Sequence, residues 1–331
     1  MSYIAVIGAG SWGTSLARIL AEKEYDVSLW VYEEDLCREM ISTRVNEFYL
    51  PGFPIPDSVS ITSHIAEAVE RARYILNVIP TQFSRQVIKK ALSHAAPDAV
   101  FINAAKGIER KTLLTVSSIV KEFSDHRVAA LSGPSFAQEV ARNLPTAVTL
   151  ACDDAPTSLL LQEIFNTQHF RVYTHDDILG VELGGALKNV IAIASGISDE
   201  LRLGHNARAA LLTRGLAEIK RLGVAMGAQE HTFFGLSGMG DLILTCTANL
   251  SRNYTLGANL ARGMKLSDIL SQSKSVVEGV TTAESAYELS MKYAVPMPFV
   301  EQVYKVLYEG KDPGLAVREL MNRALKTEFH A

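Results

Sequence analysis

The segment IAVIGAGSWGTSLARIL, residues 4–20, sets the architecture of the first half of this chain. It begins with a short apolar run that is typical of a buried strand, and the pattern Gly-x-Gly-x-x-Gly follows directly at residues 8–13. The rest of the segment has the spacing of a helix. A strand, a glycine-rich turn and a helix in this order indicate a dinucleotide-binding unit, and this context is far more specific than the glycines alone.

Each glycine of the motif has a separate expected role. Gly8 permits the tight turn, Gly10 lets the backbone approach a pyrophosphate, and Gly13 lets the helix pack on the sheet. The first N–H groups of the helix would then bind the phosphates. The alternative is a glycine-rich turn without a ligand, and the position of the motif between a strand and a helix argues against it.

Apolar runs and helical patterns alternate over about the first 175 residues. Besides residues 4–8, six apolar runs are predicted as strands, at residues 26–30, 74–79, 99–104, 127–131, 146–150 and 170–174. Continuous apolar runs separated by amphipathic helices indicate a parallel sheet that is buried on both faces. The loop at residues 47–58 is rich in proline and aromatic residues, and we expect it to cover a neighbouring surface.

The strand patterns largely stop at Ile178. Helical spacing follows in segments separated by turns with Gly or Pro, at residues 206–227, 255–262, 281–293 and 299–309. The sequence therefore predicts an α/β fold, with a Rossmann-type parallel-sheet domain at residues 1–177 and an all-helical domain at residues 178–331. Either Thr174 or Asp176 is expected to cap the first helix of the second domain.

The composition excludes several classes of protein. The 331 residues carry a net charge of −4 and are 48% hydrophobic, so the chain has no electrostatic footprint for nucleic acid or for an anionic membrane. The three cysteines show neither metal-type spacing nor a disulfide pattern. The first strand leaves no room for a signal peptide, and no apolar run reaches membrane-spanning length. We expect a cytoplasmic globular protein without a metal site and without membrane insertion.

The end of the second predicted strand is where the coenzyme would be selected. Glu33 follows Gly13 by about twenty residues, at the place where an acid binds the ribose hydroxyls of adenosine. No arginine lies immediately beside it. This pattern favours NAD over NADP, although a surface glutamate after a strand is also common.

A lysine lies inside the apolar segment VELGGALKNVIAIASGI, residues 181–197. On a helix, the neighbours of Lys188 three and four positions away include Gly184, Gly185 and Ala192. A buried lysine rarely lacks a partner, and desolvation lowers its pKa and makes it a useful acid or base. The alternative is a lysine whose stem packs in the core while its ammonium group reaches solvent.

Two loops of the first half follow predicted strands, where ligands bind in open α/β sheets. Lys106 comes directly after the strand at 99–104, from which it can reach a substrate oxygen or phosphate. Gly133 and Ser135 begin a predicted helix and suit an anion or a polar substrate. The alternatives are a solvated loop lysine and an ordinary helix cap.

Polar residues of the second half also suggest a binding site. Asp241 lies between a glycine-rich turn and an apolar run, which is an unusual place for a carboxylate without a cationic partner. Its alternative role is to cap the following helix. Arg252 beside Asn253 offers a planar donor fork and an amide that suit a phosphate, and the alternative for this pair is an exposed helix surface.

Seven segments of the chain together carry a family resemblance. In order, they are GAGSWGTSLA, NAAKGIE, LSGPSFAQEV, ELGGALKNVIAIASGI, GLSGMGDLILTCT, SRNYTLG and VVEGVTTAESA. They resemble the motifs of the bacterial NAD(P)-dependent glycerol-3-phosphate dehydrogenases from residue 4 to about residue 300. The resemblance implies reversible reduction of dihydroxyacetone phosphate to sn-glycerol 3-phosphate, with NAD or NADP, at the entry to glycerophospholipid synthesis.

The resemblance also implies roles for individual residues. Lys188 would contact the substrate and be its proton donor and acceptor, while Lys106 and Arg252 would each contact both substrate and cofactor. The other residues implied to line the substrate are Gly133, Ser135, Asp241, Ser251 and Asn253. The other residues implied around the nucleotide, besides the three glycines of the motif, are Ser11, Trp12, Tyr49, Ala137, Val276 and Glu278.

Tyr32 departs from the family pattern. Members often have arginine or histidine at this position, just after the second strand. A tyrosine can stack on the adenine of the cofactor, but it has no charge for a 2′-phosphate. The choice between NAD and NADP therefore stays open.

Two alternative functions can be compared with this one. The 3-hydroxyacid dehydrogenases also join a dinucleotide domain to a helical domain, but they space the catalytic Lys and a following Asn by one helical turn, whereas Lys188 and Asn189 are adjacent. A non-catalytic dinucleotide-binding redox sensor has no reason to combine Lys188 with Lys106, Asp241 and Arg252. Because apolar helical domains of this kind often dimerise, we also expect a homodimer.

Overall fold

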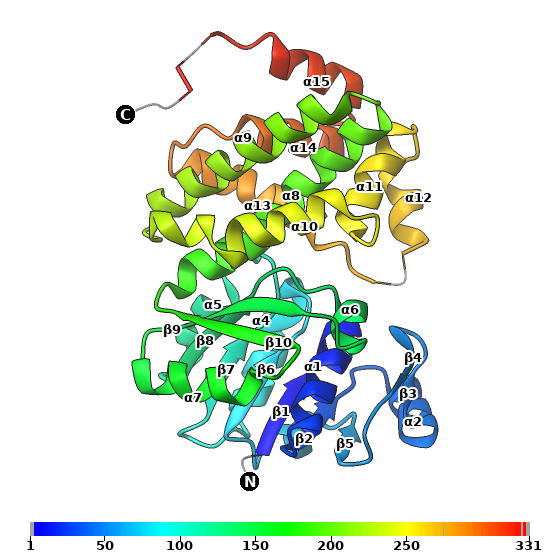
Figure 1. The fold of residues 1–331 in the computed structure, drawn as a ribbon, viewed down its shortest axis with the longest axis vertical. Helices are drawn as coiled ribbons and strands as arrows, with labels where there is room; N and C mark the ends of the chain where they lie inside the picture. Colours follow the sequence, from blue (N-terminus) through cyan, green and yellow to red (C-terminus); the bar gives the residue numbers. More distant parts are fainter. Residues whose placement is uncertain (1–2, 274, 326, 329–331) are drawn as a thin grey trace.

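The computed structural model describes residues 3–273, 275–325 and 327–328 of the chain. It consists of a sheet half and a helical half stacked on it (Figure 1). The strands are β1 (Tyr3–Ile7), β2 (Asp26–Trp30), β3 (Val45–Asn46), β4 (Leu50–Pro54), β5 (Val59–Thr62), β6 (Tyr74–Asn77), β7 (Val100–Asn103), β8 (Arg127–Ser132), β9 (Thr146–Cys152) and β10 (Phe170–His175). The helices of the sheet half are α1 (Ser11–Glu22), α2 (Glu34–Thr43), α3 (Ile65–Val69), α4 (Thr81–Leu92), α5 (Val116–Phe123), α6 (Ala137–Ala141) and α7 (Ala155–Phe165).

The helical half follows β10. Its elements are α8 (Ile178–Glu200), α9 (Gly204–Ala225), the short helical turns η1 (Glu230–Phe234) and η2 (Leu236–Gly240), α10 (Asp241–Thr247), α11 (Arg252–Ala261), α12 (Leu266–Ser271), α13 (Glu278–Lys292), α14 (Pro298–Tyr308) and α15 (Pro313–Met321). Every regular element of this half is helical in the part of the chain that the structure describes. The predicted fold class is therefore confirmed.

The main sheet has eight strands in the order β10-β9-β8-β7-β6-β1-β2-β5. Successive residues of β1 point to opposite faces, because Ile4 and Val6 belong to one core with α1, whereas Ala5 and Ile7 belong to another with α4. β1 lies between β2 and β6, so the chain first builds the sheet on one side of β1 and then on the other. Ligands of open α/β sheets bind at such a switch point, outside the carboxyl ends of the strands.

The prediction that the sheet is parallel is wrong at one pair of strands. β9 runs antiparallel to β8, with Ser132 opposite Thr149. The connection, residues 133–145, contains only the five-residue α6, which is too short to cross the sheet and return the chain in parallel. α7 then supplies a crossover helix, and β10 is parallel to β9. As a result, the start of β9 lies beside the end of β8, at the edge where ligands bind.

The segment at residues 45–62 contains three strands that the sequence pattern did not predict. β3 and β4 form an antiparallel hairpin, and β5 extends the main sheet beside β2. β4 has the sequence LPGFP, and its prolines and glycine conceal the strand pattern. The predicted loop at 47–58 is thus mostly a short hairpin and the beginning of its connection to β5.

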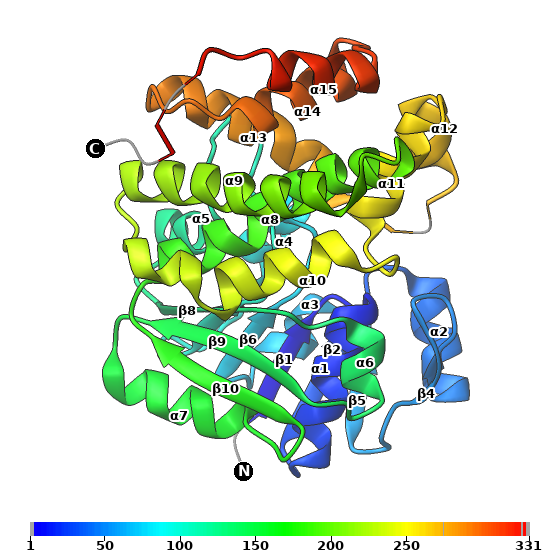
Figure 2. The same ribbon diagram turned by 45° about the horizontal axis from the view of Figure 1, so that its top comes forward.

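α8 is the central helix of the second half and packs against α9, α10, α11 and α13 (Figure 2). Its cap is Asp177, whose Oδ1 accepts a hydrogen bond of 2.8 Å from Gly180 N. The prediction of Thr174 or Asp176 as the cap is therefore wrong, because the cap is the residue directly before the first helical one. The expectation that no apolar run reaches membrane-spanning length is wrong for α8, which could cross a membrane by length and composition alone. However, 83% of its apolar stretch is buried inside the protein, as in a core helix.

Candidate active site

Lys188 lies in the middle of α8, and its side chain is 7% exposed. Its Nζ lies 2.8 Å from Oδ1 of Asp241 and donates a hydrogen bond of 2.6 Å to Oγ1 of Thr245. Both partners belong to α10 and are one turn apart, so they lie on the same face of that helix. The alternative of a lysine that reaches solvent is wrong, since its ammonium group ends in a buried polar cluster.

Asp241 binds a second lysine. Its Oδ2 lies 2.7 Å from Nζ of Lys106, which also donates a hydrogen bond of 2.9 Å to the carbonyl oxygen of Gly133. The Asp241 side chain is 1% exposed. It does not cap α10, because it is the first residue of that helix and its carboxylate bridges two ammonium groups. The alternatives of a capping Asp241 and a solvated Lys106 are therefore both wrong.

These three charged groups shape the chemistry of the site. Two cations around one anion leave a net positive charge, which favours an anionic ligand. Burial is the main cause that lowers the pKa of Lys188 to about 8. The positive charge of Lys106 lowers this pKa further, and the negative charge of Asp241 raises it. A group with this pKa can either donate or accept a proton near neutral pH.

Two residues of the cluster were not assigned a role from the sequence. Thr245 is the fourth residue after Asp241, a spacing that would have placed it beside the carboxylate on a helix.

Asn189 is the second of these residues. It donates from Nδ2 to the carbonyl oxygen of Lys106 at 3.2 Å. Its Oδ1 accepts a hydrogen bond of 2.9 Å from Nδ2 of Asn253, and Oδ1 of Asn253 in turn accepts one from Gly279 N. Asn253 therefore connects α11 to α8 and α13.

Ser251 and Arg252 lie at the start of α11. The Ser251 hydroxyl caps this helix by accepting a hydrogen bond of 3.3 Å from Tyr254 N. The Arg252 side chain is accessible to solvent, yet desolvation by the surrounding protein lowers its pKa, while Glu278 and Tyr49 raise it. Arg252 thus interacts electrostatically with α13 and with the β3–β4 hairpin.

The segment after β8 forms one wall of the site. Gly133 has φ of +148°, and a Cβ atom there would lie 2.9 Å from the Cα atom of Val148 in β9, so only glycine fits. The Ser135 hydroxyl donates to the carbonyl oxygen of Gly133 at 2.9 Å. Ala137 begins α6, and its carbonyl oxygen accepts a hydrogen bond of 2.9 Å from the Ser15 hydroxyl of α1. This contact joins the wall to the helix of the glycine motif.

The glycine motif has the geometry expected of a dinucleotide loop. A Cβ atom on Gly13 would lie 1.9 Å from the carbonyl oxygen of Gly8, so the turn requires glycine there. A Cβ atom on Gly10 would meet nothing within 4 Å, so its outer side is open. α1 begins at Ser11 without a side-chain cap and without an acidic residue in its first turn. Its first N–H groups are thus available to a phosphate.

Buried polar atoms near this loop also fit a nucleotide. Nε1 of Trp12 and Oε2 of Glu278 are buried and have no hydrogen-bond partner within the described part of the chain. The other oxygen of Glu278, Oε1, accepts a hydrogen bond of 3.0 Å from Thr81 N, which joins α13 to α4. Burial raises the pKa of Glu278 to about 7, while Arg252 lowers it. Val276, two residues before Glu278, is 36% exposed.

The β3–β4 hairpin lies beside the glycine loop. Asn46, which is fully buried, donates from Nδ2 to the carbonyl oxygen of Ala9 at 2.7 Å and to Oγ1 of Thr14 at 2.9 Å. The hydroxyl of Tyr49 donates a hydrogen bond of 2.9 Å to Oε1 of Glu33. Asn46 was missed from the sequence because a buried asparagine in a proline-rich segment gives no periodic signal.

The surface after β2 is acidic. Tyr32 is 75% exposed and packs edge-on against Trp30, with ring centroids 6.0 Å apart. Glu33 is followed by two more acids in the first turn of α2, and Arg38 pairs with both of those. The structure places no unpaired arginine beside Glu33 among the described residues of this turn.

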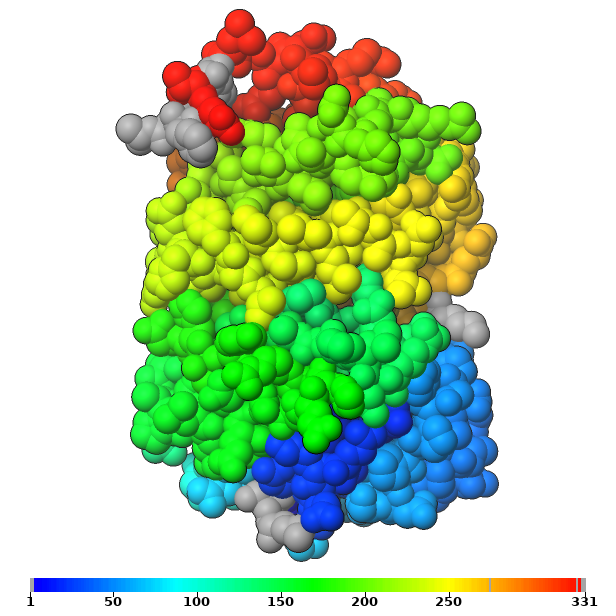
Figure 3. All heavy atoms as spheres, in the orientation of Figure 1, coloured from blue at the N-terminus to red at the C-terminus, as the bar shows by residue number. Residues whose placement is uncertain are grey.

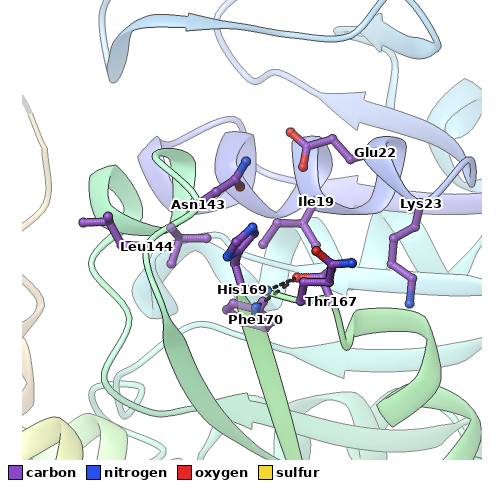
Figure 4. A pocket seen from close by; sticks show the side chains of 10 residues that line it. Ile19, Glu22, Lys23, Asn143, Leu144, Thr167, His169 and Phe170 are labelled. Atoms are coloured by element: carbon purple, nitrogen blue, oxygen red, sulfur yellow. Dashed lines mark hydrogen bonds between the residues drawn. The ribbon is translucent and has the colours of Figure 1, made fainter.

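A separate pocket of about 280 Å³ opens elsewhere, at the far end of α1. Figure 4 shows its lining side chains, which come from the end of α1, from α6 and the segment after it, and from the connection that leads into β10. None of the sequence-predicted site residues lines it. The candidate site lies instead where the helical half meets the sheet half, and Figure 3 shows the two halves in direct contact.

Comparisons with known proteins identify the family of this chain. The family model of the NAD-dependent glycerol-3-phosphate dehydrogenase N-terminus matches residues 3–158, and that of the C-terminus matches residues 177–318. The chain is 52% identical over 329 residues to glycerol-3-phosphate dehydrogenase [NAD(P)+] of Geobacter sulfurreducens, with 98% of each chain covered. It is 51% identical over 330 residues to the enzyme of the same name from Syntrophotalea carbinolica, covering 98% of this chain and 99% of the relative.

Solved structures show the same likeness. The crystal structure of glycerol-3-phosphate dehydrogenase from Coxiella burnetii is 42% identical, with a TM-score of 0.94 over 97% of this chain and 99% of that one. Glycerol-3-phosphate dehydrogenase of Saccharomyces cerevisiae is 27% identical, with a TM-score of 0.84 over 97% and 99%. The resemblance of the seven sequence motifs is thereby confirmed. Two matched halves, full-length relatives and the shared fold show that this chain is an NAD(P)-dependent oxidoreductase and belongs to the NAD-dependent glycerol-3-phosphate dehydrogenase family.

Proposed function

We propose that the chain catalyses the reversible reduction of dihydroxyacetone phosphate to sn-glycerol 3-phosphate. The observation that carries this proposal is the buried Lys188–Asp241–Lys106 cluster, which lies at the carboxyl edge of the sheet. Arg252 begins α11 and precedes Asn253, which binds Asn189 beside Lys188. Membership of the family supports the choice of substrate.

Lys188 is the proposed proton donor. The glycine loop and the start of α1 would hold NADH or NADPH, which would supply a hydride for the carbonyl carbon of the substrate. The carbonyl oxygen gains negative charge in this step, and the ammonium group of Lys188 donates a proton to it. Asp241 and Thr245 orient the ammonium group through contacts of 2.8 and 2.6 Å with Nζ. In the reverse direction, neutral Lys188 accepts the proton of the substrate hydroxyl.

Substrate recognition is assigned to the polar residues around this lysine. Lys106 and Arg252 supply positive charge, and a planar arginine fork matches a phosphate especially well. The remaining proposed substrate contacts are Gly133, Ser135, Asp241, Ser251 and Asn253. Because the Asn253 amide already bonds Asn189 and Gly279 N, we assign it a second role in holding α11 in place.

The nucleotide is assigned to the opposite side of the site. The open glycine loop and the uncapped start of α1 would hold the pyrophosphate, as proposed for Gly8, Gly10, Ser11, Trp12 and Gly13. Tyr32 would stack on the adenine. The remaining proposed contacts are Tyr49, Lys106, Ala137, Arg252, Val276 and Glu278.

The coenzyme choice gives the first prediction. Tyr49 holds Glu33 by a hydrogen bond, and position 32 is occupied by a tyrosine rather than by a basic residue. kcat/KM for NADH should therefore be at least comparable to that for NADPH. Absorbance at 340 nm with each coenzyme measures this ratio, and Glu33→Gln should shift it toward NADPH. A preference for NADPH of a hundredfold, about 2.7 kcal/mol of discrimination, would contradict the assignment.

The pH dependence follows from the lowered pKa of Lys188, about 8. Reduction requires the protonated lysine, so its kcat/KM should be constant below this pKa and fall as the pH rises through it. Oxidation requires the neutral lysine, so its kcat/KM should rise through the same range. The pH profile of kcat/KM reports the pKa values of the free enzyme. Identical profiles in the two directions would count against Lys188 as the titrating group.

The reaction itself is tested by identifying its product. Purified protein with NADH and dihydroxyacetone phosphate should yield sn-glycerol 3-phosphate and no other enantiomer. A 3-hydroxyacid dehydrogenase would instead oxidise unphosphorylated hydroxyacids, and a redox sensor would bind the coenzyme without turnover. Either of these outcomes would replace the proposed function.

The wider setting is also proposed. We infer that the enzyme acts in the cytoplasm as a homodimer and supplies the backbone of glycerophospholipids. We also divide the chain into a dinucleotide-binding domain at residues 1–177 and a substrate domain at residues 178–331. The start of α8 at Ile178 and the separate core of the helical half support this division. Light scattering of the purified protein tests the dimer.

A further inference from the structure

Glu182 is a buried acid that the proposed reaction does not use. It lies on α8, six residues before Lys188, and is 5% exposed. Its Oε1 accepts hydrogen bonds from Nδ2 of Asn103 at 2.6 Å, from Ser117 N at 3.0 Å and from the Ser117 hydroxyl at 2.9 Å. Three donors thus converge on one oxygen and connect α8 to β7 and α5.

Asn103 shapes the turn that carries Lys106. It is the last residue of β7, and its Nδ2 also donates to the carbonyl oxygen of Ala105 at 3.2 Å. Its Oδ1 accepts a hydrogen bond of 3.0 Å from Ala105 N. Since Lys106 follows Ala105 directly, the Asn103 side chain fixes the position of the backbone from which Lys106 extends.

α8 holds this turn at its other end as well. Nδ2 of Asn189 donates to the carbonyl oxygen of Lys106 at 3.2 Å. Glu182 and Asn189 are seven residues apart, which is about two helical turns, so they lie on the same face of α8. The helix that carries Lys188 therefore contacts the turn of Lys106 at two points, through Glu182 and through Asn189. Of the two residues, Glu182 is farther along the helix from Lys188.

We propose that Glu182 is a positioning residue that fixes Lys106 relative to Lys188, and thereby sets the electric field in which Lys188 transfers its proton. This inference rests on the proposed function of Lys188. Lys106 acts on Lys188 through its charge and through the Asp241 carboxylate that the two lysines share. A shift of Lys106 would therefore change both substrate binding and proton transfer.

No cation is among the groups that act on the pKa of Glu182. Burial raises the pKa of Glu182, and the groups that oppose this effect are the polar side chains of Thr115, Ser117 and Asn103 rather than any cation. Its second oxygen, Oε2, is buried without a hydrogen-bond partner among the described residues. Because the donors of Asn103 and Ser117 all converge on Oε1, glutamine, which keeps one acceptor oxygen, can preserve these three contacts.

The experiment compares Glu182→Gln with Glu182→Leu. Glutamine keeps the acceptor oxygen, so its kcat/KM and the pH midpoint of reduction should stay within about twofold of the wild type. Leucine removes the acceptor, and the displaced Lys106 should cost at least about tenfold in kcat/KM, because small misplacements have effects of this size. It should also raise the pH midpoint, since Lys106 lowers the pKa of Lys188, whereas Asp241 and Cys246 raise it.

Glu218 provides a matched control. It is another buried acid, 1% exposed, and accepts hydrogen bonds from Phe299 N and Val300 N at the start of α14. Glu218→Leu should lower thermal stability without moving the pH midpoint. A purely structural role for Glu182 predicts the same result for Glu182→Leu.

The outcomes separate this inference from the proposed function. If the wild type does not reduce dihydroxyacetone phosphate, the proposed function fails. If the wild type is active with a midpoint near 8 and folded Glu182→Leu keeps that midpoint, the positioning role is wrong. It is equally wrong if Glu182→Gln is as impaired as Glu182→Leu. Should the leucine variant not fold, Asn103→Ala breaks the same link from the other side, and an unchanged midpoint in that variant overturns the inference.

Discussion

Replacement of Lys188 by methionine is expected to lower kcat by a factor of about 10² to 10⁴, which is the usual contribution of general acid catalysis. Methionine keeps most of the apolar stem and removes the ammonium group. Asp241 retains Lys106 as a partner, so its buried carboxylate is not left without a cation. The variant should therefore fold and bind the coenzyme, while proton transfer to the substrate becomes slow.

The measurement is kcat under conditions in which the chemical step limits the rate, together with coenzyme affinity by titration. Lys220→Met is a suitable control, because Lys220 pairs with Glu230 on the surface of the helical half and should retain wild-type kcat. A folded Lys188→Met variant with more than about a tenth of the wild-type kcat would show that another group supplies the proton.

Replacement of Arg252 by alanine is expected to raise KM for dihydroxyacetone phosphate by at least about thirtyfold. Loss of a charge-assisted contact to a phosphate costs about 2 kcal/mol or more, and each 1.4 kcal/mol corresponds to about tenfold. We use the lower value, about 2 kcal/mol, because Arg252 is accessible to solvent. Since Arg252 is also assigned to the nucleotide, coenzyme affinity should fall as well.

Arg262 is the control for this change. It follows the other end of α11 and pairs with Glu200 at 2.7 Å, so Arg262→Ala alters the same helix without touching the site. Its KM should remain at the wild-type value. An unchanged KM in folded Arg252→Ala would assign the phosphate to other residues, with Lys106 as the next candidate.

Most of the fold could be predicted from the sequence, because buried parallel strands and amphipathic helices have distinct periodicities. All seven apolar runs predicted as strands form strands, and β2 begins and ends where its pattern does. The antiparallel β9 was not predictable, since its apolar run looks the same in either direction. The β3–β4 hairpin was missed because prolines replace the alternating pattern in β4.

The site was only partly predictable. Local context identified Lys188, Lys106 and Asp241 as unusual, but the sequence could not show that one carboxylate binds both lysines, because 135 positions separate Lys106 from Asp241. The sequence also left open whether burial or a counter-ion has the larger effect on the pKa of Lys188. In the structure burial has the larger effect, and it lowers this pKa. The roles of Asn189 and Glu182 depend on contacts with a distant turn, so no local pattern reveals them.

The most direct test of the proposed function compares two ketones that differ only in the phosphate. Wild-type protein is mixed with NADH and either dihydroxyacetone phosphate or dihydroxyacetone, and the loss of absorbance at 340 nm gives kcat/KM for each. The net positive cluster around Asp241, together with Arg252, predicts that kcat/KM for the phosphorylated ketone is higher by at least about a hundredfold. Equal values for the two ketones, or no turnover of dihydroxyacetone phosphate with either coenzyme, would contradict it.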